Sequence, residues 1–257
     1  MISYSTEVTS SKILSDNPLY QRTLKAYHLV APLVNGNTLE IGFGEGYGVP
    51  IYKSKVDTLT LIDKSRKHVN QIKRQHKDCI VHLKKVPLMN FIKDNTFDTV
   101  ISFQVIEHIK DYNLFLKEIN RILKPGGKAY ITTPNRLKSI ARNPWHFKEF
   151  NYDEIFSTLK SSFSKFTIQG IQGSKLSNSY YDHNQRSVAR LLKFDVLNLL
   201  NKLPSTVLKL PYEIGNRINR IQLLKQNKNL VYQIGLNDYF LDDYNTETLD
   251  FFCILEK

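Results

Sequence analysis

Residues 38–48 of this chain run TLEIGFGEGYG, a short apolar strand that leads into alternating glycines. Glycine lets the backbone turn sharply and lets a ligand approach where a Cβ atom would clash. Because Tyr47 holds the place of the third glycine, the segment departs from the G-x-G-x-x-G fingerprint of dinucleotide-binding proteins. On its own, the segment leaves a plain tight turn open as the alternative.

Two carboxylates flank this glycine loop. Glu40 lies two residues before Gly42, and Asp63 ends the next predicted strand, 19 residues after Gly44. Glu40 would repel a pyrophosphate and favours a ligand with an ammonium group nearby. In doubly wound folds, an acid at the position of Asp63 accepts hydrogen bonds from ribose hydroxyls. A ligand with a ribose, an ammonium group and no phosphate is S-adenosylmethionine, which we expect as the cofactor.

Apolar runs and helical spacings alternate around the loop. We expect strands at residues 38–42, 58–63, 79–83, 98–105, 128–133, 165–171 and 251–256, and helices at 18–34, 111–123, 153–159 and 186–203. This alternation predicts an α/β protein with a doubly wound, mostly parallel sheet.

Four segments resemble the class I S-adenosylmethionine-dependent methyltransferases, in particular their type 11 subgroup of small-molecule and glycan-modifying enzymes. They are LEIGFGEGYG (39–48), LIDKS (61–65), FDTVISFQVIEHIKD (97–111) and LKPGGKAYITTPN (123–135). The resemblance implies a Rossmann-like seven-stranded sheet with an antiparallel last strand. We expect a single methyltransferase domain over residues 1–257. It would carry an N-terminal helical segment (1–35) and a helical insertion or substrate cap (174–249).

The resemblance also implies a set of cofactor-binding residues: Glu40, Gly42, Phe43, Gly44, Asp63, Lys64, Val86 and Gln104. The first four would surround the methionine part of the cofactor. Asp63, with Lys64 beside it, would hold the ribose, Val86 would contact the adenine, and Gln104 would face the substrate side. The family usually places an acid near the adenine amino group after the third strand, where this chain has Lys84 and Lys85.

Residues 142–150 (RNPWHFKEF) follow the fifth predicted strand and resemble an element of bacterial methyltransferases linked to surface polysaccharide. Ligands bind at that edge of such sheets, and histidine changes charge near neutral pH. We therefore expect His146 as a catalytic general base, with Glu149 as its partner. The alternative is a histidine that fixes the loop by hydrogen bonding, with Glu149 as an N-terminal acid of the next helix. We expect no metal ligands.

Charge bears on the partners of the protein. The chain has 36 Lys and Arg against 24 Asp and Glu, a net charge of +12, and half of this excess lies in residues 184–225. The excess favours an anionic small molecule or glycan, allows peripheral contact with an anionic membrane surface, and makes nucleic acid a less favoured partner. A solvated basic face is the alternative.

Cysteine usage and the first residues bear on localisation. Cys79 and Cys253 form neither a disulfide framework nor a metal site. Residues 1–16 are polar and lack the apolar stretch of a secretory signal, and no apolar run is long enough to span a bilayer. We expect a cytoplasmic bacterial enzyme that methylates an oxygen or nitrogen of a small molecule or glycan. The alternatives are an RNA or protein methyltransferase and a non-catalytic binding module that keeps the fold.

Overall fold

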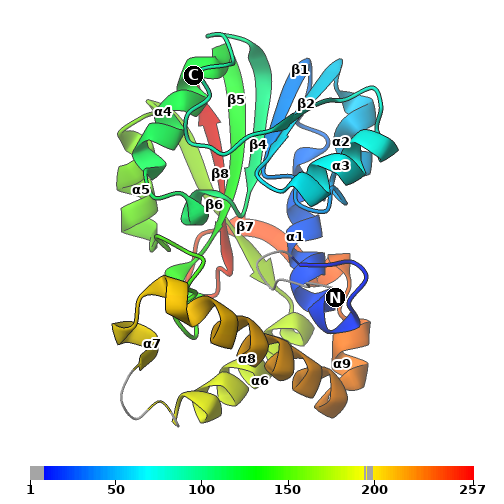
Figure 1. Cartoon of the computed structure of the whole chain (residues 1–257), viewed down its shortest axis with the longest axis vertical. Helices are drawn as coiled ribbons and strands as arrows, with labels where there is room; N and C mark the ends of the chain where they lie inside the picture. Colours follow the sequence, from blue (N-terminus) through cyan, green and yellow to red (C-terminus); the bar gives the residue numbers. More distant parts are fainter. Residues whose placement is uncertain (1–8, 194, 196–198) are drawn as a thin grey trace.

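The computed structural model describes residues 9–193, 195 and 199–257. Eight of its strands form one mixed sheet in the order β3-β2-β1-β4-β5-β8-β6-β7 (Figure 1). They are β1 (Asn37–Ile41), β2 (Thr58–Asp63), β3 (Ile80–Leu83), β4 (Phe97–Phe103), β5 (Leu123–Pro134), β6 (Lys165–Gly173), β7 (Tyr239–Asp243) and β8 (Asp250–Glu256). Strands β1 to β5 are parallel, and β8 lies antiparallel between β5 and β6.

Helices cover both faces of the sheet, and each face has its own hydrophobic cluster. One cluster includes residues of α1 (Asn17–Val30), α2 (Val49–Tyr52) and α3 (Arg66–Gln75). The other includes residues of α4 (Tyr112–Ile122) and α5 (Tyr152–Lys160). The short 3₁₀ helices are η1 (Leu14–Asp16), η2 (Lys53–Lys55), η3 (Ile106–His108), η4 (Arg136–Lys138) and η5 (Leu236–Asp238).

Local sequence explains why α4 forms where it does. Its buried side chains recur at helical spacing (Phe115, Leu116, Ile119 and Ile122), so one face of the helix packs on the sheet. Asp111 caps the helix by accepting a hydrogen bond from the backbone N–H of Leu114. The helix ends at Ile122, and β5 begins at the next residue.

The doubly wound sheet and its antiparallel last strand are confirmed, but the sheet has eight strands rather than seven. The additional strand, β7, pairs with β6 at the edge of the sheet. It lies inside residues 174–249, where the sequence lacks a clear alternation of strands and helices. Exposed Asp242 and Asp243 at its end are typical of an edge strand, which explains why no apolar pattern marks it.

Two boundaries also differ from expectation. Strand β5 begins at Leu123, five residues before the expected start at residue 128, and so takes in the last residue of the helix expected at 111–123. The single helix expected over residues 186–203 is instead represented by α6 (Lys175–Leu192) and α7 (Leu199–Lys202). Residues 194 and 196–198 of that expected helix lie outside the described part of the chain.

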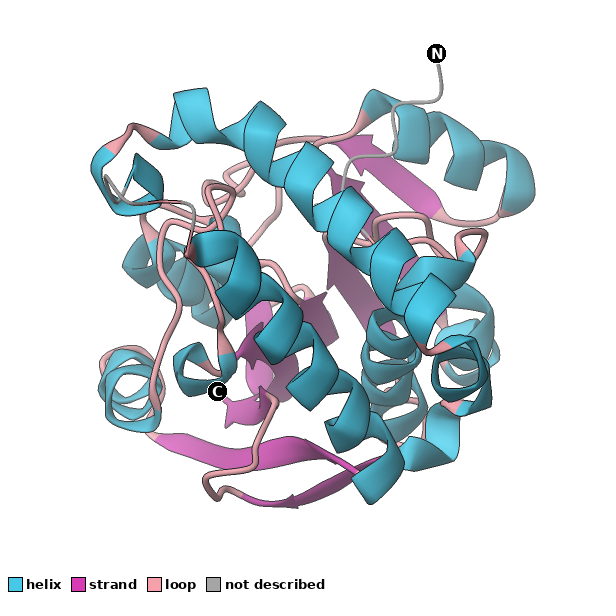
Figure 2. Cartoon of the chain, turned by 90° about the horizontal axis from the view of Figure 1, so that it is seen from below, coloured by secondary structure: helices cyan, strands magenta, loops and turns pink. Residues whose placement is uncertain are grey.

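Beyond the carboxyl ends of the parallel strands lies a second layer of helices. It consists of α6, α7, α8 (Ser205–Gln226) and α9 (Lys228–Gln233), at the bottom of Figure 1. Helices α6 and α8 contact each other, and both lie at the front of the molecule in Figure 2. Among the described helices, none combines the length and apolarity needed to cross a membrane.

Buried ion pairs attach α8 to the rest of the domain. The fully buried Asp16, just before α1, accepts hydrogen bonds from Arg217 at 2.7 Å and Arg220 at 3.0 Å. The amide of Asn219 donates to Asn184 of α6 at 2.7 Å. Because breaking a buried ion pair leaves an uncompensated charge, these contacts fix which face of α8 points inward.

Candidate functional site

Two cavities meet at the carboxyl edge of the parallel strands. The smaller has a volume of about 350 Å³ and lies against the ends of β1, β2 and β3. The larger, of about 770 Å³, lies between the sheet edge and helices α6 to α8. Both are lined by Gly42, Gly44, Gln104 and His108, so these four residues form their boundary. Both volumes lie in the range of small-molecule sites.

The glycine loop after β1 forms part of this boundary. Gly42 and Gly44 have φ angles of +80° and +56°, a region that other residues enter only with strain. A Cβ atom on Gly42 would lie 2.4 Å from Cγ2 of Val105, which follows β4. The close approach of these two loops therefore requires glycine at position 42.

Asp63 lies at the end of β2, as predicted, and lines the smaller cavity. Its carboxylate accepts hydrogen bonds from the backbone N–H groups of Gly44 at 3.0 Å and Ser65 at 2.7 Å. Burial raises the pKa of Asp63, and these two N–H groups counter part of that rise. The carboxylate thus links the glycine loop to the start of α3. Its contact with a ribose stays a prediction.

The structure brings most of the other predicted cofactor residues to the same place. Lys64 and Val86 line the smaller cavity, and Gln104 lines both cavities with a φ of +56°. The buried Phe43 lines the larger cavity. Lys84 and Lys85 also line the smaller cavity.

Glu40 occupies a different position from the one expected. Its carboxylate is buried, accepts hydrogen bonds from the hydroxyls of Tyr27 (2.6 Å) and Tyr52, and is not among the described residues that line either cavity. Burial raises its pKa to about 7, although both tyrosine hydrogen bonds act in the opposite direction. Tyr27 itself lines the larger cavity, so Glu40 supports the cavity wall from behind. Direct contact with a ligand stays a prediction.

His68 is a member of the smaller cavity that the sequence did not point out. It lies in the first turn of α3, and its backbone N–H donates to the capping side chain of Ser65. Its Nδ1 is buried and has no hydrogen-bond partner among the described residues. A ligand in the cavity could satisfy this atom. The sequence could have pointed to His68 because it lies three residues after Ser65, the helix cap that follows the strand ending in Asp63.

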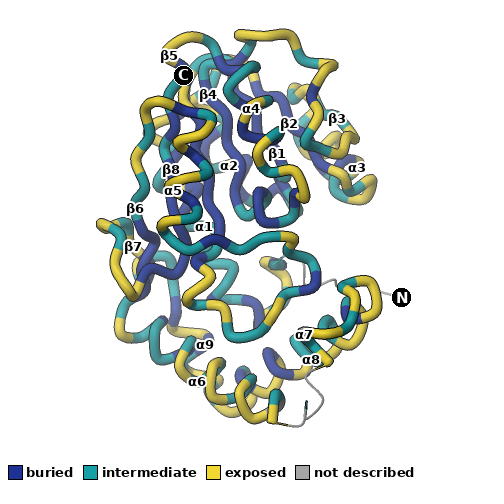
Figure 3. The backbone as a smooth tube through the Cα atoms, turned by 90° about the vertical axis from the view of Figure 1, so that its left-hand side faces the viewer, coloured by how far each residue is buried: buried dark blue, intermediate teal, exposed yellow. Residues whose placement is uncertain are grey.

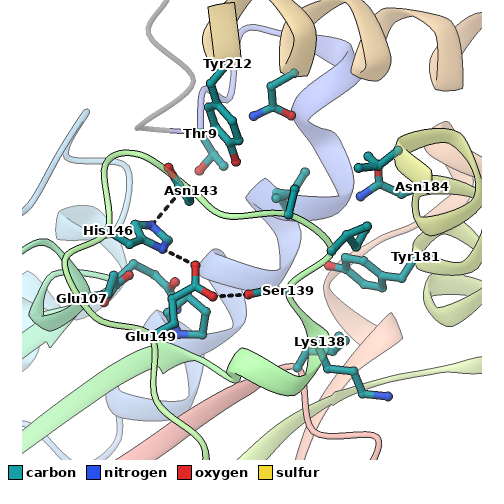
Figure 4. A pocket seen from close by; sticks show the side chains of 18 of the residues that line it. Thr9, Glu107, Lys138, Ser139, Asn143, His146, Glu149, Tyr181, Asn184 and Tyr212 are labelled. Carbon is teal, nitrogen blue, oxygen red and sulfur yellow. Dashed lines mark hydrogen bonds and ion pairs between the residues drawn. The ribbon is translucent and has the colours of Figure 1, made fainter. Parts of the chain in front are cut away.

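The predicted pair of His146 and Glu149 is present in the larger cavity (Figure 4). Nδ1 of His146 lies 2.5 Å from Oε1 of Glu149, and its Nε2 lies 2.9 Å from the side-chain amide of Asn143. The amide oxygen of Asn143 accepts from the N–H of Trp145 at 3.0 Å, which orients its NH₂ group toward His146. This network assigns the proton of the neutral imidazole to Nδ1 and the lone pair to Nε2.

Glu149 is held as a carboxylate. Burial alone would raise its pKa, but hydrogen bonds from His146 and Ser139 outweigh that effect and lower the pKa below its ordinary value. The side chains of His146 and Glu149 are only 13% and 14% exposed, so little water competes for their contact. The pair therefore has the acid–histidine arrangement of a general base with a fixed orientation.

Glu107 and His108, from the 3₁₀ helix after β4, lie beside this pair. Donor atoms of Glu107, His108 and His146 all lie within 4.8 Å of one another, so the three side chains could hold a metal ion. Nδ1 of His108 lies 3.0 Å from the carbonyl oxygen of Trp145. Both ring nitrogens of His146 already face Glu149 and Asn143, so a metal ion there would have to displace Asn143.

Glu107 is a second functional candidate that the sequence did not single out. It is buried, lines the larger cavity and accepts a hydrogen bond from the hydroxyl of Thr133 at 3.0 Å. Burial raises its pKa to about 7, and a protonated His146 and the hydrogen bond from Thr133 would act in the opposite direction. Its carbonyl oxygen also accepts from the N–H of Phe147, which ties the loop that carries His146 to the end of β4.

The residues of the smaller cavity fit S-adenosylmethionine. The carboxylate of Asp63 is the kind of acceptor that ribose hydroxyls need, and Nδ1 of His68, which has no hydrogen-bond partner among the described residues, could make a further polar contact. The boundary residues then open into the larger cavity, where an acceptor could meet the methyl group.

Comparisons with known proteins agree with this geometry. A family model described as "Methyltransferase domain" matches residues 39–131. A "Probable S-adenosylmethionine-dependent methyltransferase" of Mycobacterium tuberculosis is 31% identical over 153 residues, which are 56% of this chain and 54% of the relative. A "Ubiquinone biosynthesis O-methyltransferase" of Pelagibacter ubique is 27% identical over 183 residues, covering 63% and 76% of the two chains. The chain thus spans about half the length of the mycobacterial relative.

Solved structures show the same fold. A "SAM-dependent methyltransferase, possible histamine N-methyltransferase" from Thermotoga maritima superposes with a TM-score of 0.56 at 17% identity, covering 93% of this chain and 92% of that one. An Archaeoglobus fulgidus "SAM dependent methyltransferase" gives 0.53 at 16% identity, with 94% of each chain covered. Residues 39–131 thus match a methyltransferase domain, and the chain is similar to S-adenosylmethionine-dependent methyltransferases.

Proposed function

We propose that this protein transfers a methyl group from S-adenosylmethionine to an oxygen or nitrogen of a small molecule or glycan, with a hydroxyl oxygen favoured. The observation that carries this proposal is the junction of two cavities at Gly42, Gly44, Gln104 and His108. The smaller cavity has the polar groups for the adenosyl part. The larger is a half-open space walled by helices, of a size that suits a compact acceptor better than a folded polymer.

Polar side chains in the larger cavity support an acceptor that carries hydroxyl groups. Asp182, Asn184 and Gln185 of α6 and Asn216 of α8 line it opposite the catalytic pair. Aromatic groups contribute as well, because Tyr180 and Tyr181 also line the cavity, with their ring centres 5.4 Å apart. Such a mixture of amides, a carboxylate and aromatic rings is suited to a sugar or a polyhydroxylated ring.

His146 is the proposed general base, and Glu149 is its positioning partner. S-adenosylmethionine supplies a methyl group bonded to a positively charged sulfur, and this sulfur is a good leaving group. In the proposed step, Nε2 of His146 takes the proton of the acceptor hydroxyl, in place of its contact with Asn143. The oxygen lone pair then forms the new bond to the methyl carbon as the carbon–sulfur bond breaks. The proton on Nδ1 stays on His146, and the carboxylate of Glu149 accepts a hydrogen bond from it and so stabilises the imidazolium that forms.

The two free cysteines support the proposal that the protein works in a reducing compartment, the cytoplasm. The net charge of +12 favours an anionic acceptor. The function is tested with methyl-labelled S-adenosylmethionine and a panel of hydroxylated small molecules, glycans, RNA and protein. We expect label in a small molecule or glycan. Label only in RNA or protein would overturn the proposed acceptor class, and no cofactor binding would overturn the activity itself.

A further inference from the structure

The outer face of α8 carries a row of exposed apolar side chains. They are 42% to 67% exposed: Val207, Leu210, Ile214, Ile218 and Ile221. Spacings of three and four residues place them along one face of the helix, over a length of about 21 Å. Single exposed apolar residues are common, but a continuous row on one helix marks an interaction surface. We call these five residues the α8 stripe.

The opposite face of the same helix is occupied by the domain. Leu208, Arg220 and Leu223 are buried, and Tyr212 and Asn216 line the larger cavity. The ion pairs of Arg217 and Arg220 with Asp16 prevent the helix from turning its stripe inward. Figure 3 shows exposed turns along the outer side of the helical layer. The stripe is therefore a surface feature that the fold maintains.

Not all basic residues of helix α8 lie beside the stripe. Arg217 and Arg220 pair with Asp16 on the inner face, and the ammonium group of Lys209 lies 3.9 Å from the ring centre of Trp145. Exposed lysines also lie at its two ends, with Lys202 just before the helix and Lys225 and Lys228 at and beyond its last turn. A second copy of the chain seated on this face would bring the exposed lysines of the two copies near one another. Anionic headgroups would instead complement the charge.

We propose that the α8 stripe docks on an anionic lipid surface. The helix lies in the plane of the surface, with its apolar side chains among the upper acyl chains and the lysines at its ends against the headgroups. This docking is independent of the proposed chemistry, because it uses only the outer face of α8. It concerns a surface contact, whereas the acceptor cavity lies on the inner face of the same helix.

The position of the cavity gives the docking a consequence, which rests on the proposed function. Leu199, Leu200 and Leu203, around α7, line the larger cavity, and Leu199 is 43% exposed. Leu208 and Pro211 continue this apolar lining along the start of α8. An acceptor with an apolar tail could thus keep its tail near the lipid surface while its polar head reaches His146.

Vesicle sedimentation tests the docking. The full chain is mixed with vesicles of phosphatidylcholine alone or of an equimolar mixture of phosphatidylcholine and phosphatidylglycerol. We expect binding to the anionic vesicles that weakens as salt rises, and little binding to the neutral ones. The double variant Leu210→Gln/Ile214→Gln should lose affinity for the anionic vesicles by a factor of about ten or more. The matched control Ile80→Gln/Phe240→Gln, which replaces comparably exposed apolar residues at the two edges of the sheet, should bind like the unmodified protein.

Circular dichroism and S-adenosylhomocysteine binding check that the variants fold and keep the cofactor site. Absence of binding to anionic vesicles, or equal binding by the stripe variant, would overturn the proposal. A dimer in solution that the stripe variant dissociates, together with absence of vesicle binding, would show that the occupant is a second copy. Cofactor titration reports on the proposed function separately, so the two proposals can fail independently.

Discussion

Nδ1 of His146 lies 2.5 Å from Oε1 of Glu149, and this contact fixes both the direction of the imidazole ring and the position of its proton. Asn143 completes the arrangement by directing its NH₂ group to Nε2. The loop that carries all three residues is attached to the end of β4 through the carbonyl of Glu107. His146, the proposed base, is therefore held by the same strand end that forms the boundary of the two cavities.

His146→Ala should lower turnover by ~10²–10⁴-fold, the usual contribution of a general base. Cofactor affinity should change little, because His146 lines the larger cavity and not the smaller one, which is the proposed cofactor site. Initial rates and calorimetric titration with S-adenosylhomocysteine separate the two effects. A variant that turns over as fast as the unmodified enzyme would assign His146 to loop positioning alone.

Asp63→Ala should weaken cofactor binding about tenfold or more, because it removes the acceptors proposed for the ribose hydroxyls. Asp63 also orients the glycine loop through the N–H of Gly44, so thermal unfolding without ligand should be measured beside the titration. Asp153→Asn, on the exposed side of α5, is the control for loss of a carboxylate. Unchanged affinity in Asp63→Ala would remove this residue from the site.

Gly42→Ala should both destabilise the fold and impair cofactor binding. Any side chain in the left-handed region costs about 1–2 kcal/mol, and here the new Cβ would also lie 2.4 Å from Val105. Gly126→Ala is a matched control, since Gly126 has a φ of +75° and no atom within 4 Å of its would-be Cβ. Chemical denaturation should show a clearly larger loss for Gly42→Ala. Equal losses would mean that strain alone, and not the close approach of the loops, explains the glycine.

Stability should fall as the pH rises from about 4.5 to 7. Burial raises the pKa of Glu40 in the fold to about 7, so the folded state binds more protons than the unfolded state in this window. The free energy of unfolding therefore decreases toward high pH, by up to about 3 kcal/mol from this one group. Glu107 acts in the same direction.

Glu40→Gln should make the free energy of unfolding depend less on pH, and the dependence that remains should come from Glu107. Denaturation at pH 5 and pH 8 measures the difference, and Asp153→Asn should behave like the unmodified protein. If Glu40→Gln loses as much stability across the window as the unmodified protein does, Glu40 is ionised in the fold throughout.

Chelation tests the cluster of Glu107, His108 and His146. Because His146 already has partners at both ring nitrogens, we expect the methyl transfer rate to survive treatment with a chelator. Activity that is lost on chelation and restored by a divalent ion would instead assign these three residues as metal ligands.

The part of the fold that follows from the sequence is the part with strong local patterns. The strand at 58–63 is found with the same bounds, and the glycine loop, Asp63, Val86 and Gln104 meet as their positions at strand ends required. Parallel strands bring their carboxyl ends to one edge of a sheet, so residues far apart in sequence could be placed together without coordinates.

What the sequence did not predict depends on tertiary packing. The place of Glu40 behind Tyr27 depends on the way α1 packs, which no local pattern encodes. Strand β7 is only five residues long and ends in two aspartates, so it does not stand out in the sequence. The inward side of α8 is set by ion pairs with Asp16, about two hundred residues away in the sequence. Glu107 and His68 became visible as site residues only through the cavities that they line.

A crystal structure of the protein with S-adenosylhomocysteine gives the most direct test of the cofactor site. The account predicts the nucleoside in the smaller cavity, with its ribose hydroxyls bonded to Asp63 and its sulfur at the boundary formed by Gly42 and Gln104. A ligand bound elsewhere, or a ribose without contact to Asp63, would contradict it.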